Sequence, residues 1–449
     1  MTPKILTRER NAILTSLAAG VVPRVGLQHV QVGRKAEVKA LLEDLSHIEE
    51  GGSAVRFVVG RFGAGKSFFL NLIQMVALER KFLVMRADIT TQRRLYASNG
   101  EARALYTELT RNLSTRNRPD GGALKNVIER WISEIAQNID PEGNDFLIVE
   151  QELSKRCQPL LEHVGGFDFV EVLRAYYRGY IQNDESLQNA ALKWLYGEYT
   201  TKTEARNDLN IRTIVDDASY YDYLKLFAIF AKLIGYAGVL ICLDEMVVLS
   251  HRLNNRIARN NNYEAILRIL NDCLQGSVSN LGFIFAATDE CLTDTRRGLF
   301  SYEALSSRLA ANRFAVPGLV DLHGPVLQLQ PLTPEDCFVL LDNIRRVYAP
   351  GDSSAYLLPD EAITAYLQSC ANRMGSAYYQ TPRETIKDFV GLLDVLHQNP
   401  GTTWQELLPN IQTTAADMQK EETYPVIEDE EGISTRLEPN EADLATFKL

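Results

Sequence analysis

An eight-residue glycine-rich segment constrains the fold of this chain more than any other part of its sequence. The segment Gly60-Arg-Phe-Gly-Ala-Gly-Lys-Ser67 matches the pattern G-x-x-x-x-G-K-[ST] and directly follows an apolar run at 54–59. Apolar residues then recur at helical spacing, which predicts a helix over 66–79. A glycine-rich turn between a buried strand and a helix points backbone N–H groups at an anion, beside a helix N-terminus that favours negative charge. We therefore expect a phosphate-binding loop at the edge of a sheet.

The residue types in this loop predict that ATP and Mg²⁺ bind to it. Lys66 supplies a positive charge for the β- and γ-phosphates, which also gives it a catalytic role, and the Ser67 hydroxyl is a ligand for Mg²⁺. The glycines let the backbone wrap closely around the phosphates. The residues assigned to the nucleotide in this loop are Gly60, Gly63, Ala64, Gly65, Lys66, Ser67 and Phe68.

A pair of adjacent acids, Asp244-Glu245, directly follows the apolar run at 239–243. Two carboxylates at the carboxyl end of a buried strand are costly unless they manage a cation or a proton. We expect Asp244 to hold Mg²⁺ and Glu245 to polarise the attacking water. The alternative is an acid pair at a helix N-terminus. With a phosphate-binding loop upstream, the catalytic interpretation is favoured, and the pair predicts an ATP hydrolase.

Five short apolar runs predict the strands of an α/β fold. They are rich in β-branched or aromatic residues and are separated by helical patterns, which favours a parallel sheet covered on both faces. The runs are 54–59, 82–85, 239–243, 281–286 and 326–329. We therefore predict a P-loop NTPase fold around a five-stranded parallel sheet.

The intervals between these strands predict the organisation of the chain. About 150 residues from Thr90 to Gly238 carry helical and no strand patterning, and since a crossover needs one helix, we expect an inserted helical subdomain. Residues 333–397 predict three or four further helices, the first starting at Thr333-Pro334. The predicted units are 1–99 (N-terminal helix and first part of the core), 100–235 (helical insertion), 236–330 (second part of the core), 331–410 (helical lid) and 411–449 (acidic, disordered tail).

Charge and composition leave nucleic-acid binding open. The net charge is −11, and residues 411–449, with ten acids and three bases, account for −7 of it (3 − 10). The remaining −4 on the body neither favours nor excludes a nucleic-acid partner. Local basic spots occur at Arg93-Arg94, at Arg252/Arg256/Arg259 and at Arg296-Arg297. We favour solvated surface for each of them over a nucleic-acid contact.

The cysteines and the N-terminus indicate a cytoplasmic protein. Six scattered cysteines without a CxxC pair predict buried reduced thiols, with neither a disulfide framework nor a zinc site. The run 12–22 after three basic residues imitates a secretory signal, but Thr15 and Ser16 interrupt it and its apolar residues fit one face of a short helix. No stretch approaches the ~20 apolar residues of a membrane span.

Three further positions carry a weaker signal. Thr288 follows the run 281–286 and would be placed to orient a water molecule, although a turn residue there needs no function. Arg308 follows a helix-like stretch, and Arg383 begins a helix in the C-terminal helical unit. Surface arginines are common, so neither position identifies a function by itself.

The order of these parts resembles the AAA+ superfamily, specifically its origin-recognition or initiator branch. Proteins of that branch have a short sequence box before the P-loop that packs against the adenine. The segment Val30–Glu37, with Gly33 and Arg34, resembles this box, and the resemblance implies the same role for it. Asp244-Glu245 would be the Walker B pair, and Thr288 the sensor-1 residue, where relatives often have asparagine. Ser307-Arg308-Leu309 resembles the box with the arginine finger, and Thr381-Pro-Arg383-Glu resembles the sensor-2 region of the lid.

A closer resemblance covers most of the chain. The phrase Gly20-Val-Val-Pro23 leading to Val32-Gly-Arg34, the loop at 60–67, the large helical insertion and Thr381-Pro-Arg-Glu look like the BrxD-type ATP-binding proteins of BREX systems, which protect bacteria from bacteriophages. The acidic tail and much of 100–235 match no motif.

This resemblance implies an AAA+ ATPase that couples Mg-ATP binding and hydrolysis to the remodelling or loading of a partner on DNA. Expected partners are other defence-system proteins, among them a helicase-like one, together with DNA and further subunits in a homo- or hetero-oligomer, without a membrane. The alternatives are a nucleotide-gated DNA-binding adaptor with little turnover, and a replication initiator or transposition regulator on the same fold.

Overall fold

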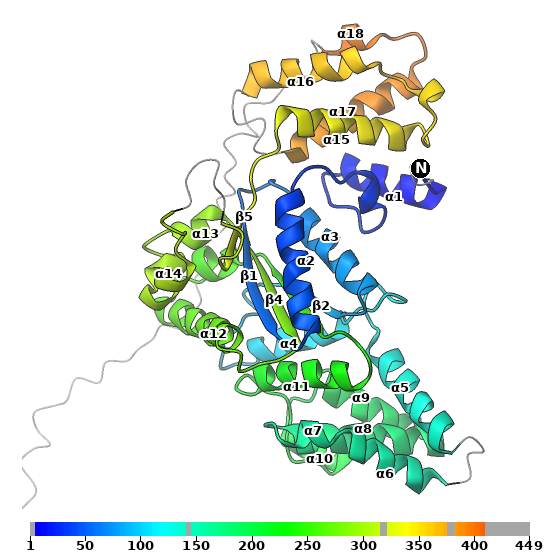
Figure 1. The fold of residues 1–449 in the computed structure, drawn as a ribbon, viewed down its shortest axis with the longest axis vertical. Coiled ribbons are helices and arrows are strands. Elements are labelled where there is room, and N and C mark those ends of the chain that lie inside the picture. Colours follow the sequence, from blue (N-terminus) through cyan, green and yellow to red (C-terminus); the bar gives the residue numbers. More distant parts are fainter. Residues whose placement is uncertain (1–4, 141–144, 315–320, 375–381, 409–449) are drawn as a thin grey trace, which may run out of the picture.

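The computed structural model describes residues 5–140, 145–314, 321–374 and 382–408. Its centre is a five-stranded sheet in the order β2-β3-β4-β1-β5, in which all paired strands are parallel (Figure 1). The strands are β1 (Ser53–Val59), β2 (Leu83–Asp88), β3 (Val239–Asp244), β4 (Leu281–Ala287) and β5 (Val326–Gln328). The predicted α/β fold and its five strands are therefore confirmed.

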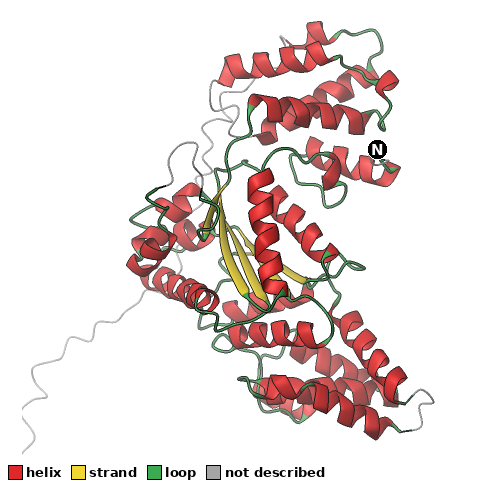
Figure 2. Cartoon of the chain, in the orientation of Figure 1, coloured by secondary structure: helices red, strands yellow, loops and turns green. Residues whose placement is uncertain are grey.

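Helices cover both faces of the sheet, as Figure 2 shows for the yellow strands between red helices. Successive side chains of a strand point to opposite faces, so Val58 packs on one side and Phe57 on the other. Helices α2 (Lys35–Glu49) and α3 (Lys66–Glu79) lie on the Val58 side. Helices α4 (Glu101–Arg111), α11 (Tyr220–Leu233) and α12 (Arg256–Leu274) pack on the Phe57 side.

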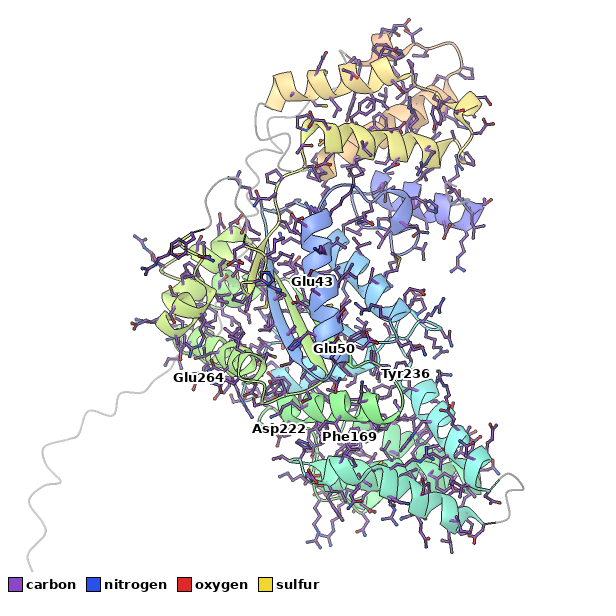
Figure 3. All side chains as sticks on the ribbon, in the orientation of Figure 1. Glu43, Glu50, Phe169, Asp222, Tyr236 and Glu264 are labelled. Carbon is purple, nitrogen blue, oxygen red and sulfur yellow. The ribbon has the colours of Figure 1, made fainter. Side chains whose placement is uncertain are left out.

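The insertion between β2 and β3 begins with α4 and ends with α11, and both contact the sheet. Between them, α5 (Leu124–Ile139), α6 (Phe146–Arg156), α7 (Gln158–Leu161), α8 (Gly166–Gln182), α9 (Glu185–Leu195) and α10 (Lys202–Leu209) project away from the sheet (Figure 1). Aromatic side chains join these projecting helices to α11, which contacts the sheet. Phe169 of α8, labelled in Figure 3, meets Phe227 of α11 edge-on, and the ring centroids are 5.3 Å apart. The insertion thus shares one apolar core with the sheet.

The C-terminal helices form a second core, which we call the lid. It contains α15 (Pro334–Tyr348), α16 (Asp360–Met374), α17 (Pro382–Gln398) and α18 (Trp404–Leu407). As predicted, Thr333 caps α15, because its hydroxyl accepts a hydrogen bond from Asp336 N. The N-terminal helix α1 (Thr7–Ala18) packs on the lid through Ile13 and Leu17, and Arg10 Nε donates to the carbonyl oxygen of Tyr348 at 2.9 Å.

Shorter elements complete the described chain. They are 3-10 turns at Leu27–His29, Leu299–Ser301 and Ser353–Ala355, a π-helical turn at Val248–Arg252, and the helices α13 (Asp289–Thr293) and α14 (Glu303–Leu309). All six cysteines are free and buried, as predicted. Within the described ranges, no helix combines the length and the apolarity that a membrane crossing requires. The tail at 411–449 and Thr381 lie outside the described residues.

Candidate nucleotide-binding site

A pocket lies where the carboxyl ends of β3 and β4 meet α1 and the lid. This edge is where open parallel sheets generally bind ligands. The polar part contains the loop 60–67 together with Asp244 and Glu245. The other part is apolar, and its lining includes Leu17, Val21, Val30, Val32, Leu340 and Ile386. The pocket is thus suited to a ligand with a flat apolar ring at one end and strong negative charge at the other.

The glycine-rich loop takes the conformation that phosphate binding needs. Gly63 and Gly65 have φ angles of 75° and 84°, which L side chains rarely adopt, and Gly65 is the residue before α3. Lys66 Nζ donates to the carbonyl oxygens of Gly60 at 2.8 Å and Arg61 at 3.0 Å. The ammonium group is therefore held across the loop. Burial lowers the pKa of Lys66, and the nearby carboxylates oppose this change.

Asp244 lies at the end of β3 and is buried, and both of its oxygens accept hydrogen bonds. The Ser67 hydroxyl donates to Oδ2 at 2.8 Å, and the Glu245 backbone N–H donates to Oδ1 at 2.8 Å. Hydroxyl and carboxylate oxygens are the ligands that Mg²⁺ prefers, and Mg²⁺ in nucleotide sites takes its other ligands from phosphates and water. Ser67 and Asp244 fit this ion. In the described chain, no group of three or more His, Cys, Asp or Glu side chains is arranged to hold a metal ion.

Glu245 is exposed to the pocket in an unusual backbone conformation. Its φ of 61° lies in the left-handed region, which is uncommon for a residue other than glycine and is frequent at functional sites. Removal from bulk water raises the pKa of Glu245, and the carboxylates of Asp244 and Asp88 raise it further. The side chain is thus placed and electrostatically tuned to accept a proton.

Asp88 is an acidic neighbour of Asp244 that the sequence interpretation missed. It ends β2 in register with Asp244, and Ile89 N donates to the carbonyl oxygen of Asp244 at 3.0 Å. The signal was present, because Asp88 follows an apolar strand in the same way as Asp244 does. What was missing is the strand order, which places β2 directly beside β3.

The segment before α2 contacts the loop through Arg34. The Arg34 guanidinium donates to the carbonyl oxygen of Ala64 and lines the pocket. Burial lowers the pKa of Arg34, although Glu37 and Asp336 oppose this, and Arg34 Nε is buried without a hydrogen-bond partner among the described residues. A Cβ on Gly33, which has a φ of 67°, would lie 3.1 Å from Asp336 Oδ2. The positive φ and the close approach of the Asp336 side chain therefore both favour glycine here.

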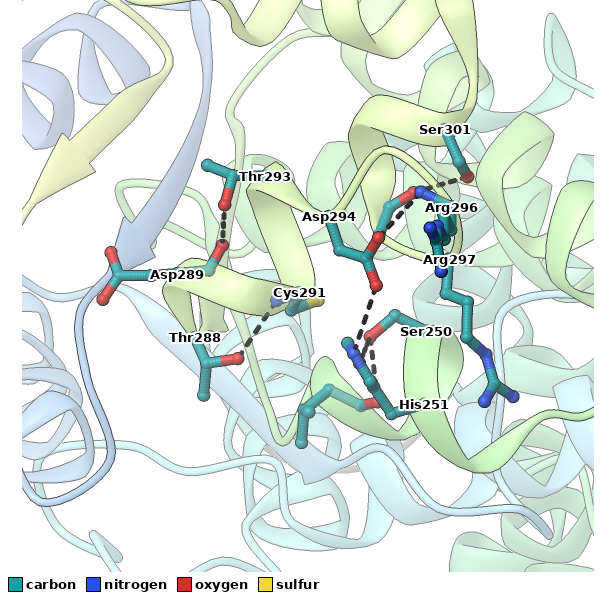
Figure 4. Close-up of polar contacts among 12 residues, drawn as sticks. Ser250, His251, Thr288, Asp289, Cys291, Thr293, Asp294, Arg296, Arg297 and Ser301 are labelled. Atoms are coloured by element: carbon teal, nitrogen blue, oxygen red, sulfur yellow. Dashed lines mark hydrogen bonds and ion pairs between the residues drawn. The ribbon is translucent and has the colours of Figure 1, made fainter. Parts of the chain in front are cut away.

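Thr288 and Arg383 also lie at the pocket. Thr288 caps α13, since its hydroxyl accepts a hydrogen bond from Cys291 N at 3.2 Å (Figure 4). Arg383 extends from the first turn of α17, and its guanidinium lies 5.6 Å from the ring centroid of Phe62 in the loop. The lid therefore contacts the phosphate-binding loop directly.

Arg308 is not part of the pocket. On α14, its guanidinium donates to Asn271 Oδ1 and to the carbonyl oxygen of Ala304, both at 2.9 Å. The fold therefore brings together the residues that were predicted to bind nucleotide or metal. Arg308, which was predicted to be catalytic, faces another part of the surface.

A comparison with protein families agrees with this arrangement. The model of the family described as BREX system ATP-binding protein BrxC/D matches residues 5–412. The chain belongs to this family. A search of curated proteins gives no match.

Membership of the BrxC/D family confirms the BrxD-type resemblance. The family is an ATP-binding family of a phage-defence system, so this chain is an ATP-binding BREX protein. Its fold is an AAA+ P-loop fold, with the helical insertion between β2 and β3 and the lid after β5.

Proposed function

We propose that this BREX protein is an Mg²⁺-dependent ATPase that couples nucleotide hydrolysis to the remodelling or loading of a partner on DNA. The observation that carries the proposal is the pair of contacts around Asp244. A hydroxyl from α3 and the backbone of Glu245 fix its two oxygens, and Glu245 faces the same pocket. A protein that only held nucleotide would need no second carboxylate at this position.

In this proposal, ATP lies with its base in the apolar part of the pocket and its phosphates along the loop. Lys66, which already faces two carbonyl oxygens, turns its charge to the β- and γ-phosphates. The unpartnered Nε of Arg34 offers a further donor at the loop. Ser67 and Asp244 would hold Mg²⁺, and the ion would supply positive charge beside the phosphates. Glu245 accepts the proton of the attacking water, and its raised pKa improves it as a base.

The lid and the insertion supply the mechanical part of the proposal. Arg383 contacts the phosphate-binding loop, and Asp336 of the lid lies close to Gly33 at the pocket. Binding and release of γ-phosphate would therefore change the lid's position relative to the sheet. The projecting helices α5–α10 would then present the surface for other BREX proteins. Division of the chain at 99, 235, 330 and 410 remains part of this proposal.

The decisive experiment compares Glu245→Gln with the wild-type protein. A general base contributes roughly 10²–10⁴ in rate, so hydrolysis should fall by that factor while ATP binding persists. Phosphate release is measured with Mg²⁺ and with a chelator, and binding by calorimetry. Asp208→Asn is a suitable control, because Asp208 lies in the insertion and accepts a hydrogen bond from Tyr199. Equal turnover of wild type and Glu245→Gln would contradict the proposal.

A further inference from the structure

A cationic surface begins immediately after the acid pair of the nucleotide site. The chain runs from Glu245 through the π-helical turn Val248–Arg252 into α12. The twelve residues 251–262 contain three arginines, one histidine and five asparagines, and no carboxylate. A run of this composition presents donors for anions without an acidic side chain to neutralise them.

The fold adds a second basic segment from 40 residues further along the chain. Arg297 Nη2 donates to Asn254 Oδ1 at 3.1 Å, and the Tyr263 hydroxyl donates to the carbonyl oxygen of Arg297. Two basic spots that are separate in the sequence, at 252–259 and at 296–297, are therefore one surface. We call it the arginine cluster, and it consists of Arg252, Arg256, Arg259, Arg296 and Arg297 (Figure 4 shows the last two).

The arginines of the cluster have different roles. Arg259 is buried and structural, because its Nη1 donates to the carbonyl oxygens of Leu253 at 2.8 Å and Asn254 at 2.9 Å. Burial lowers the pKa of Arg259, and the charges of Arg297 and Arg256 lower it further, while Asp294 opposes them. Arg256 and Arg296 are exposed, and neither guanidinium donates a hydrogen bond within the described chain. Their donors are thus directed to solvent.

Two carboxylates interact with the cluster: Glu245 with Arg252, and Asp294, which the protein itself engages. Asp294 accepts a hydrogen bond from Arg296 N at 2.7 Å, and its Oδ2 lies 3.7 Å from His251 Nε2 (Figure 4). Five arginines with only these two carboxylates retain a positive potential that an extended polyanion would match.

Apolar exposure at the same place favours a nucleic acid over a small anion. Ile257, in the first turn of α12 beside Arg256, is 70% exposed, whereas most isoleucines are buried. Exposed isoleucine, asparagine and arginine together are suited to a groove, where backbone phosphates lie beside base edges and sugars. We propose that the arginine cluster binds the phosphate backbone of a DNA duplex.

The position of the cluster connects this contact to hydrolysis, a step that rests on the proposed ATPase function. Arg252 ends the π-helical turn that begins three residues after Glu245. After β3, Ser250 Oγ lies 2.7 Å from His251 Nδ1, and His251 Nε2 lies 3.7 Å from Asp294 Oδ2 (Figure 4). After β4, Cys291 N donates a hydrogen bond to the Thr288 hydroxyl. The segments after β3 and β4 thus carry both the hydrolytic residues and the cluster, so DNA bound there would shift Glu245 and Thr288 together.

The test uses the full chain and a fluorescently labelled DNA duplex of mixed sequence. The variant Arg256→Gln/Arg296→Gln removes two exposed charges and spares the structural Arg259. Its matched control, Arg130→Gln/Arg212→Gln, removes two exposed charges from the insertion. Binding is measured by anisotropy over a range of salt concentrations. Because each phosphate contact adds about 0.9 to the slope of log affinity against log salt, the cluster variant should lose about 1.8. The control should keep the wild-type slope.

Three results would overturn the proposal. The first is equal DNA affinity in the cluster variant and the control, and the second is no DNA binding by wild-type protein at low salt. The third is that the cluster variant loses ATP hydrolysis in the absence of DNA and regains it when it is mixed with Lys66→Ala. The arginines would then act on a nucleotide bound to a second copy of the chain. Binding is also measured in a Glu245→Gln background. A protein without turnover would still report DNA affinity, so failure of the ATPase proposal and failure of this one remain distinguishable.

Discussion

The Ser67 hydroxyl donates a 2.8 Å hydrogen bond to Asp244 Oδ2, although 177 residues separate the two in the chain. This contact joins α3, which starts at the phosphate-binding loop, to the end of β3. It also brings together the two oxygen ligands expected for Mg²⁺. The same carboxylate also positions Glu245, because its other oxygen accepts a hydrogen bond from the Glu245 backbone N–H.

Replacing Asp244 by asparagine should uncouple nucleotide binding from Mg²⁺. An asparagine keeps the size of the side chain but offers the cation a neutral oxygen, so Mg²⁺ should no longer increase ATP affinity. Calorimetric titrations of ATP with and without Mg²⁺ measure this difference. Asp88→Asn is the informative comparison, because Asp88 is in register with Asp244 but lacks the contact to Ser67. An unchanged Mg²⁺ dependence in Asp244→Asn would remove this residue from the metal site.

Lys66→Ala should abolish ATP binding and leave the protein folded. The ammonium group contacts only loop carbonyl oxygens in the hydrogen bonds described, so its removal leaves the apolar cores intact. Calorimetry should detect no ATP binding, and the melting temperature without nucleotide should stay near that of wild type. Lys39→Ala is a control, since Lys39 pairs only with Glu43 on the exposed side of α2. Wild-type ATP affinity in Lys66→Ala would contradict the assignment.

The raised pKa of Glu245 predicts two effects of pH. Glu245 is a base only when ionised, so hydrolysis should be lost on acidification at a pH above the ordinary glutamate value of about 4.3. The folded pKa lies above the unfolded one, so the ionised side chain destabilises the fold at neutral pH, and this cost disappears as the pH falls through the folded pKa. Glu245→Gln should therefore melt at a higher temperature than wild type at neutral pH, with a difference that shrinks in acid. A constant difference across this range would disprove the electrostatic explanation.

Arg383 and Phe62 should be energetically coupled only in the absence of nucleotide. Their contact at 5.6 Å is a cation–π interaction at an exposed site, worth about 0.5–1 kcal/mol. A double-mutant cycle with Arg383→Ala and Phe62→Ala, measured by urea unfolding, should show this coupling without ATP. If Arg383 turns to the phosphates when ATP binds, the coupling should vanish with saturating ATP. Persistence of the coupling would show that Arg383 is a structural residue of the lid.

Arg308 should act on the nucleotide of a neighbouring subunit. It does not reach its own pocket, and arginine fingers supplied in this way are worth about 10³–10⁵ in turnover. Arg308→Ala should bind ATP normally and hydrolyse it poorly. Mixing it with Lys66→Ala should restore part of the activity, because some interfaces would pair an intact loop with an intact finger.

A matched control for this experiment is Asn271→Ala. It removes the hydrogen-bond partner of Arg308 but keeps the guanidinium. If Asn271→Ala is as inactive as Arg308→Ala, or if mixed oligomers form without regaining activity, Arg308 supports α14 and α12 and has no role in catalysis.

Local sequence patterns were sufficient for the main elements of this fold. The five strands and α3 begin and end within three residues of their predicted positions, because buried strands and amphipathic helices have distinct periods. The helix cap at Thr333 also follows from a side chain that satisfies a nearby backbone N–H group. The core of the nucleotide site is similarly local, since the loop 60–67 and the pair Asp244-Glu245 each sit at the end of one strand.

The amino-acid sequence by itself determined which residues can bind phosphate and Mg²⁺ and where the strands and helices form, since these depend on near neighbours in the chain. The tertiary structure decided which of these pieces meet. Strand order placed Asp88 beside Asp244, packing placed α1 on the lid, and the loop around Asn254 joined two basic spots into the arginine cluster. Such contacts depend on distances between segments far apart in the chain, and a pattern read along one segment contains no information about them.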